Sequence, residues 1–190
     1  MLIVRSTIDE TEILQTIRDN YGGCLLGAMC IFEYRGLNDI YKCTNGNQSF
    51  FFKIYARKDI DKDAIEAEIE VVNHLKQSGL SVAYPITMKN GQYLLPIETP
   101  EGTRYGVLFS EAEGIPCNND KLEEREIVEI GHLISDMHTM LDVIPIVPKR
   151  WKLDGRLFLD RPIEILENYN KFNSQIELSF LKDVVKELKG

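Results

Sequence analysis

The sequence predicts an α+β fold: a five-stranded antiparallel sheet with one helix between its third and fourth strands, followed by a helical region. Before about residue 115, short apolar stretches alternate with turn residues, as they do in sheets. After it, apolar residues recur every three or four positions, which is helical spacing. Within the first part, Asn45-Gly46 between two apolar stretches is typical of a tight hairpin. We therefore expect one lobe over residues 1–114 and a partial helical lobe over residues 115–190.

Two helices are expected in the first lobe. Thr7 and Glu10 form a capping-box pattern, so Thr7 is the predicted N-cap of the first helix. Apolar residues then follow at helical spacing, and Gly22-Gly23 favours the end of this helix because glycine tolerates a left-handed backbone. The second helix is expected over residues 61–78, closed by Gly79.

The remaining elements follow from the same patterns. The five strands are expected over residues 30–34, 39–44, 49–55, 92–97 and 105–110. A long helix is expected over residues 121–141, with an apolar stripe formed by Ile127, Ile130, Ile134, Met137 and Leu141. Two further helices are expected over residues 162–171 and 174–188.

Composition argues against several classes of protein. The chain has 190 residues, of which 44% are hydrophobic, and a net charge of −8, so wholesale disorder is excluded. An acidic surface repels phosphate groups, and we expect no binding to nucleic acid or to anionic membranes. The N-terminal apolar stretch is too short for a secretory signal. The four cysteines follow no regular spacing, and we interpret them as reduced thiols of a cytoplasmic protein.

Lys53 and Glu68 first suggest a binding site. Lys53 lies in the third expected strand and shares a face with Phe51 and Tyr55, because strand side chains alternate. Glu68 borders the apolar stripe of the second helix, and a carboxylate at the edge of a core favours a cationic partner. The alternatives are a strand lysine that extends its ammonium to water and two unrelated surface charges. As a pair, they would match the arrangement by which kinases hold nucleotide phosphates.

The loop Gly36-Leu37-Asn38-Asp39 could bring backbone N–H groups close to a phosphate, or could be an ordinary hairpin connection. Together with the sequence around it, this loop resembles the aminoglycoside phosphotransferase and choline kinase superfamily, a branch of the protein-kinase-like fold. The matching motifs lie at residues 36–42, 52–55, 67–75, 80–85, 105–114 and 130–138. Each motif is degenerate, and it is their order and spacing that carry the resemblance. If the resemblance is wrong, the chain is instead an unrelated α+β domain.

The resemblance implies a protein-kinase-like N-lobe that binds ATP or GTP. In it, Lys53 holds the α- and β-phosphates, and Glu68 orients Lys53. The resemblance also implies that Gly36, Leu37, Asn38 and Asp39 cover the phosphates and that the base meets the backbones of Ser110, Glu111 and Ala112. Candidates for the surrounding apolar pocket are Ile40, Ile54 and Phe109. The reaction implied for the intact family is phosphorylation of a hydroxyl on an aminoglycoside- or choline-like metabolite.

The second half of the chain departs from the family pattern. Family members carry a His-Gly-Asp-x-His-x-x-Asn catalytic loop and an acidic Mg²⁺ site. None of His74, His132 and His138 is followed by an aspartate two positions on. Because His132 and His138 lie six positions apart on a helix and do not share a face, we also expect no metal site.

Two functional interpretations follow from this departure. The first is the nucleotide-binding portion of a truncated phosphotransferase, without kinase activity as this 190-residue chain. Such a fragment is expected to self-associate through exposed apolar surface of its partial second lobe. The alternative is a non-catalytic kinase-like module that binds nucleotide or a protein partner. The sequence leaves open which acceptor is used and whether the nucleotide is ATP or GTP.

Overall fold

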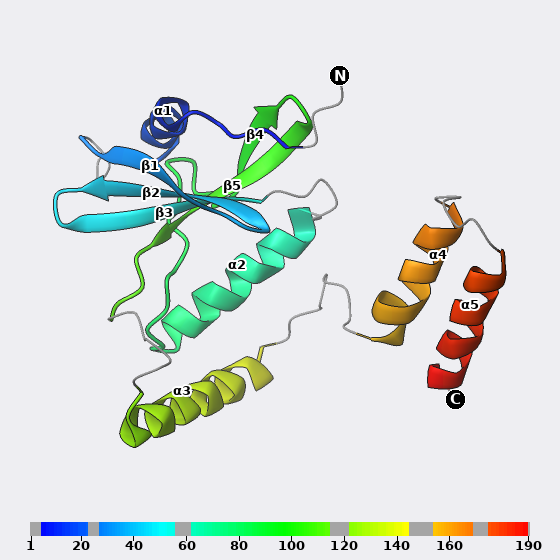
Figure 1. Cartoon of the computed structure of the whole chain (residues 1–190). Helices are drawn as coiled ribbons and strands as arrows, with labels where there is room; N and C mark the ends of the chain where they lie inside the picture. The colour runs from blue at the N-terminus through cyan, green and yellow to red at the C-terminus, as the bar shows by residue number, and fades with distance from the viewer. Residues whose placement is uncertain are drawn as a thin grey trace. The chain divides into compact units, whose positions relative to one another are not determined.

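The computed structural model describes residues 5–22, 27–55, 62–114, 122–144, 154–168 and 175–189, and the chain divides into two compact units, Met1–Val147 and Pro148–Gly190. The first unit holds α1 (Glu10–Asn20), β1 (Met29–Arg35), β2 (Asn38–Asn45), β3 (Gln48–Tyr55), α2 (Lys62–Gln77), β4 (Leu95–Thr99), β5 (Gly102–Ser110) and α3 (Glu124–Asp142) (Figure 1). The second unit holds a short π-helical turn, η3 (Arg156–Asp160), followed by α4 (Arg161–Asn168) and α5 (Gln175–Lys189). The expected division into lobes after residue 114 stays a prediction.

The five strands form one antiparallel sheet in the order β1-β2-β3-β5-β4. Asn45 pairs with Gln48, so the turn between β2 and β3 consists of Gly46 and Asn47, one position later than expected. Gly46 has a φ of 58°, which glycine adopts without strain. The predicted α+β class, with a five-stranded antiparallel sheet and a helix between its third and fourth strands, is confirmed.

Strand alternation gives the sheet two faces, and Figure 1 shows α1 and α2 on opposite sides of it. The face toward α1, which we call the α1 face, holds a buried cluster that includes Ile13, Ile17, Tyr41, Phe52, Ile54 and Leu108. The opposite face, which we call the α2 face, packs Tyr55 and Val107 of the sheet against Ile65 and Ile69 of α2. Each large apolar side chain buried in these clusters contributes about 1.5–3 kcal/mol to the free energy of folding.

The first helix begins later than expected. α1 starts at Glu10, and its N-cap is Asp9, whose side chain accepts a hydrogen bond from the Thr11 N–H at 2.8 Å. The prediction of Thr7 as N-cap is therefore wrong. The Thr7 hydroxyl instead accepts a hydrogen bond from Arg35, and the carboxylate of Glu10 accepts one from the Phe32 N–H at 2.7 Å. Both residues of the apparent capping box thus hold the start of the chain against β1.

The expected stripe of α3 is largely open to solvent. Ile127, Ile130 and Ile134 are 56%, 39% and 46% exposed. α3 contacts α2 where the His74 ring lies 3.2 Å from the Met140 carbonyl oxygen. Among the residues that the structure describes, no helix combines the length and apolar character that crossing a membrane requires.

Candidate functional site

The ion pair predicted between Lys53 and Glu68 is present. Lys53 Nζ lies 2.7 Å from Glu68 Oε1, and each side chain is about one-fifth exposed. The Tyr55 hydroxyl donates a second hydrogen bond to the same oxygen at 2.9 Å. Lys53 and Tyr55 are two positions apart in β3 and share the α2 face, and Glu68 precedes the buried Ile69 in α2. Local periodicity in one strand and one helix therefore brings the three groups together.

Aromatic rings surround the Lys53 ammonium. It lies 4.4 Å from the centre of the Tyr55 ring and 5.9 Å from that of Phe109. Ring faces attract cations, and contacts of this kind are more favourable where water is partly excluded. Glu68, Tyr55 and Phe109 together fix the position of a positive charge on the α2 face while leaving it accessible to a ligand.

The predicted loop connects β1 to β2. Gly36 and Leu37 form the connection, and Asn38 and Asp39 are the first residues of β2. Leu37 is 77% exposed at the tip. A side chain on Gly36 would meet the ring of Tyr34 at 2.7 Å, which explains why a glycine fits there. The connection is thus only two residues long, and its Leu37 side chain lies in solvent.

Asp39 and Ile40 point to opposite faces of the sheet. Ile40 pairs with Lys53 and lies on the α2 face, as expected for a residue near the candidate site. The Asp39 carboxylate is 1% exposed on the α1 face, where Arg5, Arg35 and Arg104 bind it. Any contact of Asp39 with a ligand on the α2 face would have to come from its backbone.

Ile54 belongs to the α1 face, so its expected place in an apolar pocket beside Lys53 is wrong. It is fully buried in the cluster under α1. Adjacent strand residues point to opposite faces, and Ile54 directly follows Lys53. Phe109, by contrast, lies beside the Lys53 ammonium as expected.

The end of β5 is held by the segment before β4. The Ser110 N–H donates to the Tyr84 carbonyl at 2.8 Å, and the Tyr84 N–H donates to Ser110 Oγ at 3.0 Å. Glu111 and Ala112 follow and are exposed. Because β5 pairs with β3, these residues emerge from the strand that lies beside Lys53.

Three features of the sheet and its surroundings were missed from the sequence. The bond from the Tyr55 hydroxyl to Glu68 could have been inferred, because Tyr55 shares the face of Lys53. The buried Arg104 could have been suspected from its alternation with Gly106 and Leu108 in β5. For Arg5, the sequence carries no such signal.

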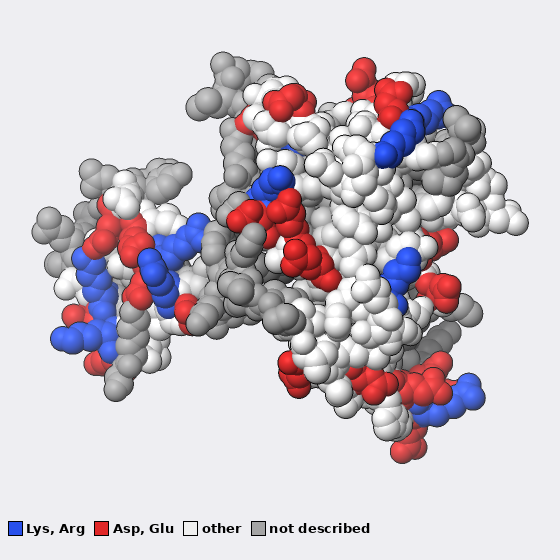
Figure 2. Space-filling model, turned by 180° about the vertical axis from the view of Figure 1, so that it is seen from behind, with Lys and Arg blue, Asp and Glu red and all other residues white. Residues whose placement is uncertain are grey.

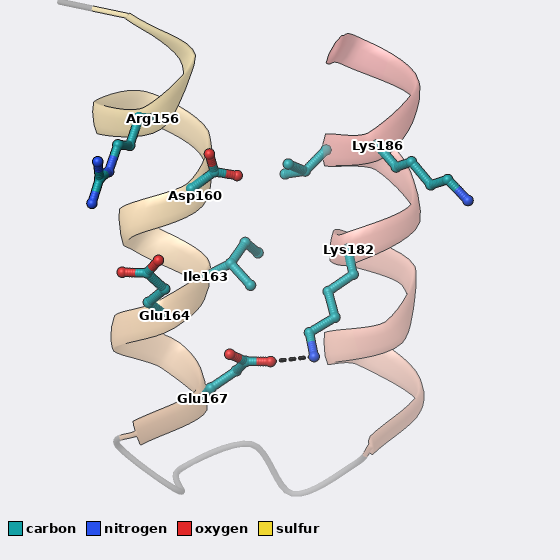
Figure 3. A pocket seen from close by; sticks show the side chains of 8 residues that line it. Arg156, Asp160, Ile163, Glu164, Glu167, Lys182 and Lys186 are labelled. Atoms are coloured by element: carbon teal, nitrogen blue, oxygen red, sulfur yellow. Dashed lines mark ion pairs between the residues drawn. The ribbon is translucent and has the colours of Figure 1, made fainter. Parts of the chain in front are cut away.

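A separate groove lies between α4 and α5 (Figure 3). Its lining is mostly charged: Arg156, Asp160, Glu164, Glu167, Lys182 and Lys186. Lys182 forms an ion pair with Glu167 across the groove. With acids and bases interspersed, the groove favours no single sign of ligand charge.

The surface shows a similar mixture of charges. On the face shown in Figure 2, red and blue groups are interspersed between wide uncharged areas, and the described Lys and Arg residues form no continuous basic surface there. The described residues of this face therefore form no positive stripe of the kind that binds a nucleic-acid backbone.

Comparison with known proteins gives two curated relatives for part of the chain. An uncharacterized protein of Synechocystis is 30% identical over 109 residues, 57% of this chain and 30% of that protein. Amicoumacin kinase of Bacillus subtilis is 26% identical over 104 residues, 54% of this chain and 31% of that protein. The chain thus matches about a third of the length of these relatives. No family profile matches it.

Solved structures match more of the chain. An amicoumacin kinase in complex with AMP-PNP and Ca²⁺ gives a TM-score of 0.64 at 18% identity, over 88% of this chain and 55% of that one. Spectinomycin phosphotransferase in complex with ADP and spectinomycin gives 0.56 at 14% identity, over 94% and 54%. Choline kinase from Cryptosporidium parvum gives 0.54 at 17% identity, over 95% and 50%.

These comparisons establish the class of fold. The chain shares the protein-kinase-like fold of these solved small-molecule kinases, and the resemblance predicted from its sequence is confirmed at the level of the fold. It spans about half the length of the solved small-molecule kinases that share this fold.

Proposed function

We propose that this chain binds ATP or GTP on the α2 face of its sheet, as the nucleotide-binding portion of a small-molecule phosphotransferase. The observation that carries the proposal is the Lys53–Glu68 ion pair with the Tyr55 hydroxyl on the same carboxylate oxygen. An isolated surface lysine has no need of a carboxylate partner that a second hydrogen bond, from the Tyr55 hydroxyl, holds in place. A lysine that must hold a phosphate needs a fixed position, because its four-carbon stem is otherwise flexible.

The charge arrangement suits a polyphosphate. Glu68 uses one donor of the Lys53 ammonium, and the remaining N–H groups are available to phosphate oxygens. The Gly36–Asp39 loop would cover the phosphates with backbone N–H groups, while Ile40 and Phe109 would provide apolar contacts nearby. The base would meet the backbone of Ser110, Glu111 and Ala112 at the end of β5.

Phosphoryl transfer itself depends on positioning and on neutralising charge at the transferred group. In kinases Mg²⁺ supplies part of that neutralisation. Among the residues that the structure describes, no three His, Cys, Asp or Glu side chains gather as ligands for a metal ion. We therefore assign no catalytic step to a metal held by these residues, and the proposal for this chain is binding.

The proposed acceptor of the intact phosphotransferase is a hydroxyl on an aminoglycoside- or choline-like metabolite. The support is the set of names that the similar proteins carry, which are kinases of amicoumacin, spectinomycin and choline. The 190 residues contain no His-x-Asp sequence that could supply the catalytic base. We propose that they bind nucleotide without transferring its phosphate.

The test is titration of the protein with a fluorescent ATP analogue, with competition by ATP and by GTP. Lys53→Ala is expected to weaken binding about 10- to 100-fold, because a hydrogen bond to a charged group contributes about 1.5–3 kcal/mol. The matched control is Lys62→Ala, which removes a lysine from the exposed Lys62–Glu66 pair of α2 and should leave the affinity unchanged.

Two outcomes would contradict the proposed function. One is the absence of saturable binding by the wild-type chain at millimolar nucleotide. The other is equal affinity in the wild type and in Lys53→Ala, which would place the nucleotide elsewhere.

A further inference from the structure

The start of the described chain is bound to the loop between β1 and β2. One guanidinium N–H group of Arg5 donates to the Gly36 carbonyl at 2.9 Å. Another lies 2.6 Å from Asp39 Oδ1, and Arg5 Nε reaches Asp39 Oδ2 at 3.4 Å. A single side chain from more than thirty positions away thus bridges the two ends of the loop.

Asp39 is itself fixed by two further arginines. Arg35 Nε binds its Oδ1 at 3.0 Å, and Arg104 binds its Oδ2 at 2.5 Å. Arg104 is 2% exposed and also donates to the Tyr55 carbonyl and the Ser6 carbonyl, both at 3.2 Å. We call Arg5, Arg35, Asp39, Glu101 and Arg104 the Asp39 cluster. It joins the start of the chain, the loop and the end of β3.

The second acid of the cluster holds the backbone next to Arg5. Glu101 accepts hydrogen bonds from the Ser6 N–H at 3.0 Å and from the Ser6 hydroxyl at 2.8 Å. Glu101 is buried, and its carboxylate also lies 3.5 Å from Arg104. The bond from the Ser6 N–H holds the backbone next to Arg5 and does not depend on the side chain of Ser6.

The loop itself has few means of keeping one shape. Gly36 has no side chain, and Leu37 extends into solvent. A backbone bond from the Gly36 N–H to the Asn38 carbonyl at 3.1 Å closes it from within. Arg5 holds it from outside, through a planar group whose N–H donors can bind a carbonyl and a carboxylate together.

We propose that Arg5 and Asp39 are positioning residues that hold the Gly36–Asn38 loop in the geometry that covers nucleotide phosphates. This inference rests on the proposed nucleotide binding on the α2 face, although the cluster lies on the α1 face and touches no ligand. Without Arg5 the loop is expected to sample several conformations. A ligand that needs one of these conformations then binds with its affinity multiplied by the fraction of time that the loop spends in that conformation.

The experiment compares wild type, Arg5→Ala, Arg5→Lys and Ser6→Ala by two readouts. The first is hydrogen–deuterium exchange of the amides at residues 36–38, with the amides of β5 as an internal reference for global stability. The second is the dissociation constant for ATP. Ser6→Ala is the matched control, because it removes a hydroxyl bond of the same segment to Glu101 without removing a group that touches the loop.

Arg5→Ala is expected to speed exchange at residues 36–38 without a matching change in β5. It should also weaken ATP binding about tenfold, which corresponds to a loop that holds the binding geometry about one-tenth of the time. Arg5→Lys should be intermediate, because lysine restores the charge beside Asp39 but not the fork that reaches Gly36 as well. Ser6→Ala should stay close to wild type in both readouts.

Unchanged loop exchange in Arg5→Ala would overturn the proposal, and so would faster exchange with unchanged ATP affinity. Equal effects in Ser6→Ala and Arg5→Ala would also overturn it, because the segment as a whole rather than Arg5 would then be responsible. A wild-type chain that binds no ATP would contradict the proposed function and, with it, the role of the loop. The exchange data would then decide separately whether Arg5 orders the loop.

Discussion

Asp39 carries one negative charge among three guanidinium groups in a nearly dry environment. Burial by itself raises the pKa of this carboxyl, but hydrogen bonds from Arg104 and Arg5 outweigh burial and hold the pKa below its ordinary value. Of the three arginines, Arg104 is as deeply buried as Asp39, whereas Arg5 and Arg35 are partly exposed to solvent. Removing a single partner of a buried ion pair costs more than the pair contributes when intact.

Asp39→Asn is expected to lower the free energy of unfolding at neutral pH by about 3–5 kcal/mol, because the buried Arg104 loses its nearer charged partner at 2.5 Å and keeps only Glu101 at 3.5 Å. Since the folded state depresses the pKa of Asp39, its stabilisation is present above the ordinary pKa of about 3.9 and is lost as the pH falls through the lower folded value. Urea denaturation from pH 7 to pH 2 checks this expectation.

The free energies of unfolding of the wild type and of Asp39→Asn should therefore differ most at pH 7 and converge at the acid end of this range. A difference that is constant across this range would contradict the assignment of the stabilisation to the Asp39 charge.

Gly106 in β5 and Gly131 in α3 show that the sheet and the third helix differ in how tightly they are packed. A side chain on Gly106 in β5 would overlap the ring of Phe52, which is fully buried and cannot move aside. Gly131 in α3 has nothing within 4 Å of the place that a side chain would occupy. The same substitution therefore probes a filled sheet interior and an open helix surface.

Gly106→Ala is expected to destabilise the fold by about 1–3 kcal/mol, as overpacking of a filled core does. Gly131→Ala should instead stabilise α3 by up to about 1 kcal/mol, because alanine is the better helix former. Circular dichroism during urea denaturation measures both. Tolerance of Gly106→Ala, or a loss of stability in Gly131→Ala, would contradict this description of the packing.

The exposed stripe of α3 predicts self-association. Exposed apolar residues at helical spacing, including Ile130 and Ile134, favour burial against another surface. The double variant Ile130→Glu/Ile134→Glu is expected to lower the average mass measured by sedimentation velocity over a concentration series. The control is the double variant His132→Glu/Ser135→Glu, which adds the same charge on the opposite face of α3. It should leave the average mass unchanged. A wild-type chain that stays monomeric at all concentrations would contradict the prediction.

Elements and pairings that depend on local sequence could be predicted, and those that depend on distant contacts could not. Alternation in β3 and periodicity in α2 were enough to pair Lys53 with Glu68. The N-cap of α1 was misplaced because the Thr7 hydroxyl binds Arg35, which lies 28 positions away. The face of Asp39 depends on the register between β2 and β3, in which Ile40 rather than Asp39 is opposite Lys53. The partnership of Arg5 with the loop follows only from the folded chain.

At the scale of the whole molecule, the chain spans about half the length of the solved kinases that share its fold. We expect no ATP-dependent phosphorylation of aminoglycoside or choline acceptors by the 190-residue protein. The physical reason is that its sequence offers no His-x-Asp base to orient an acceptor hydroxyl. ADP formation, measured beside Lys53→Ala as the control for contaminating activity, checks this. Acceptor-dependent ADP formation by the wild type alone would contradict it.

Binding of nucleotide phosphates beside Lys53 is measured most directly by labelling with an ATP analogue that carries a reactive acyl group on its terminal phosphate. Such a probe acylates a lysine amine that lies beside the bound phosphates, and mass spectrometry identifies the lysine. We expect Lys53 to be the main labelled lysine and excess ATP to suppress its labelling, although its side chain is only 22% exposed. Labelling spread over exposed lysines such as Lys62, with no protection by ATP, would contradict it.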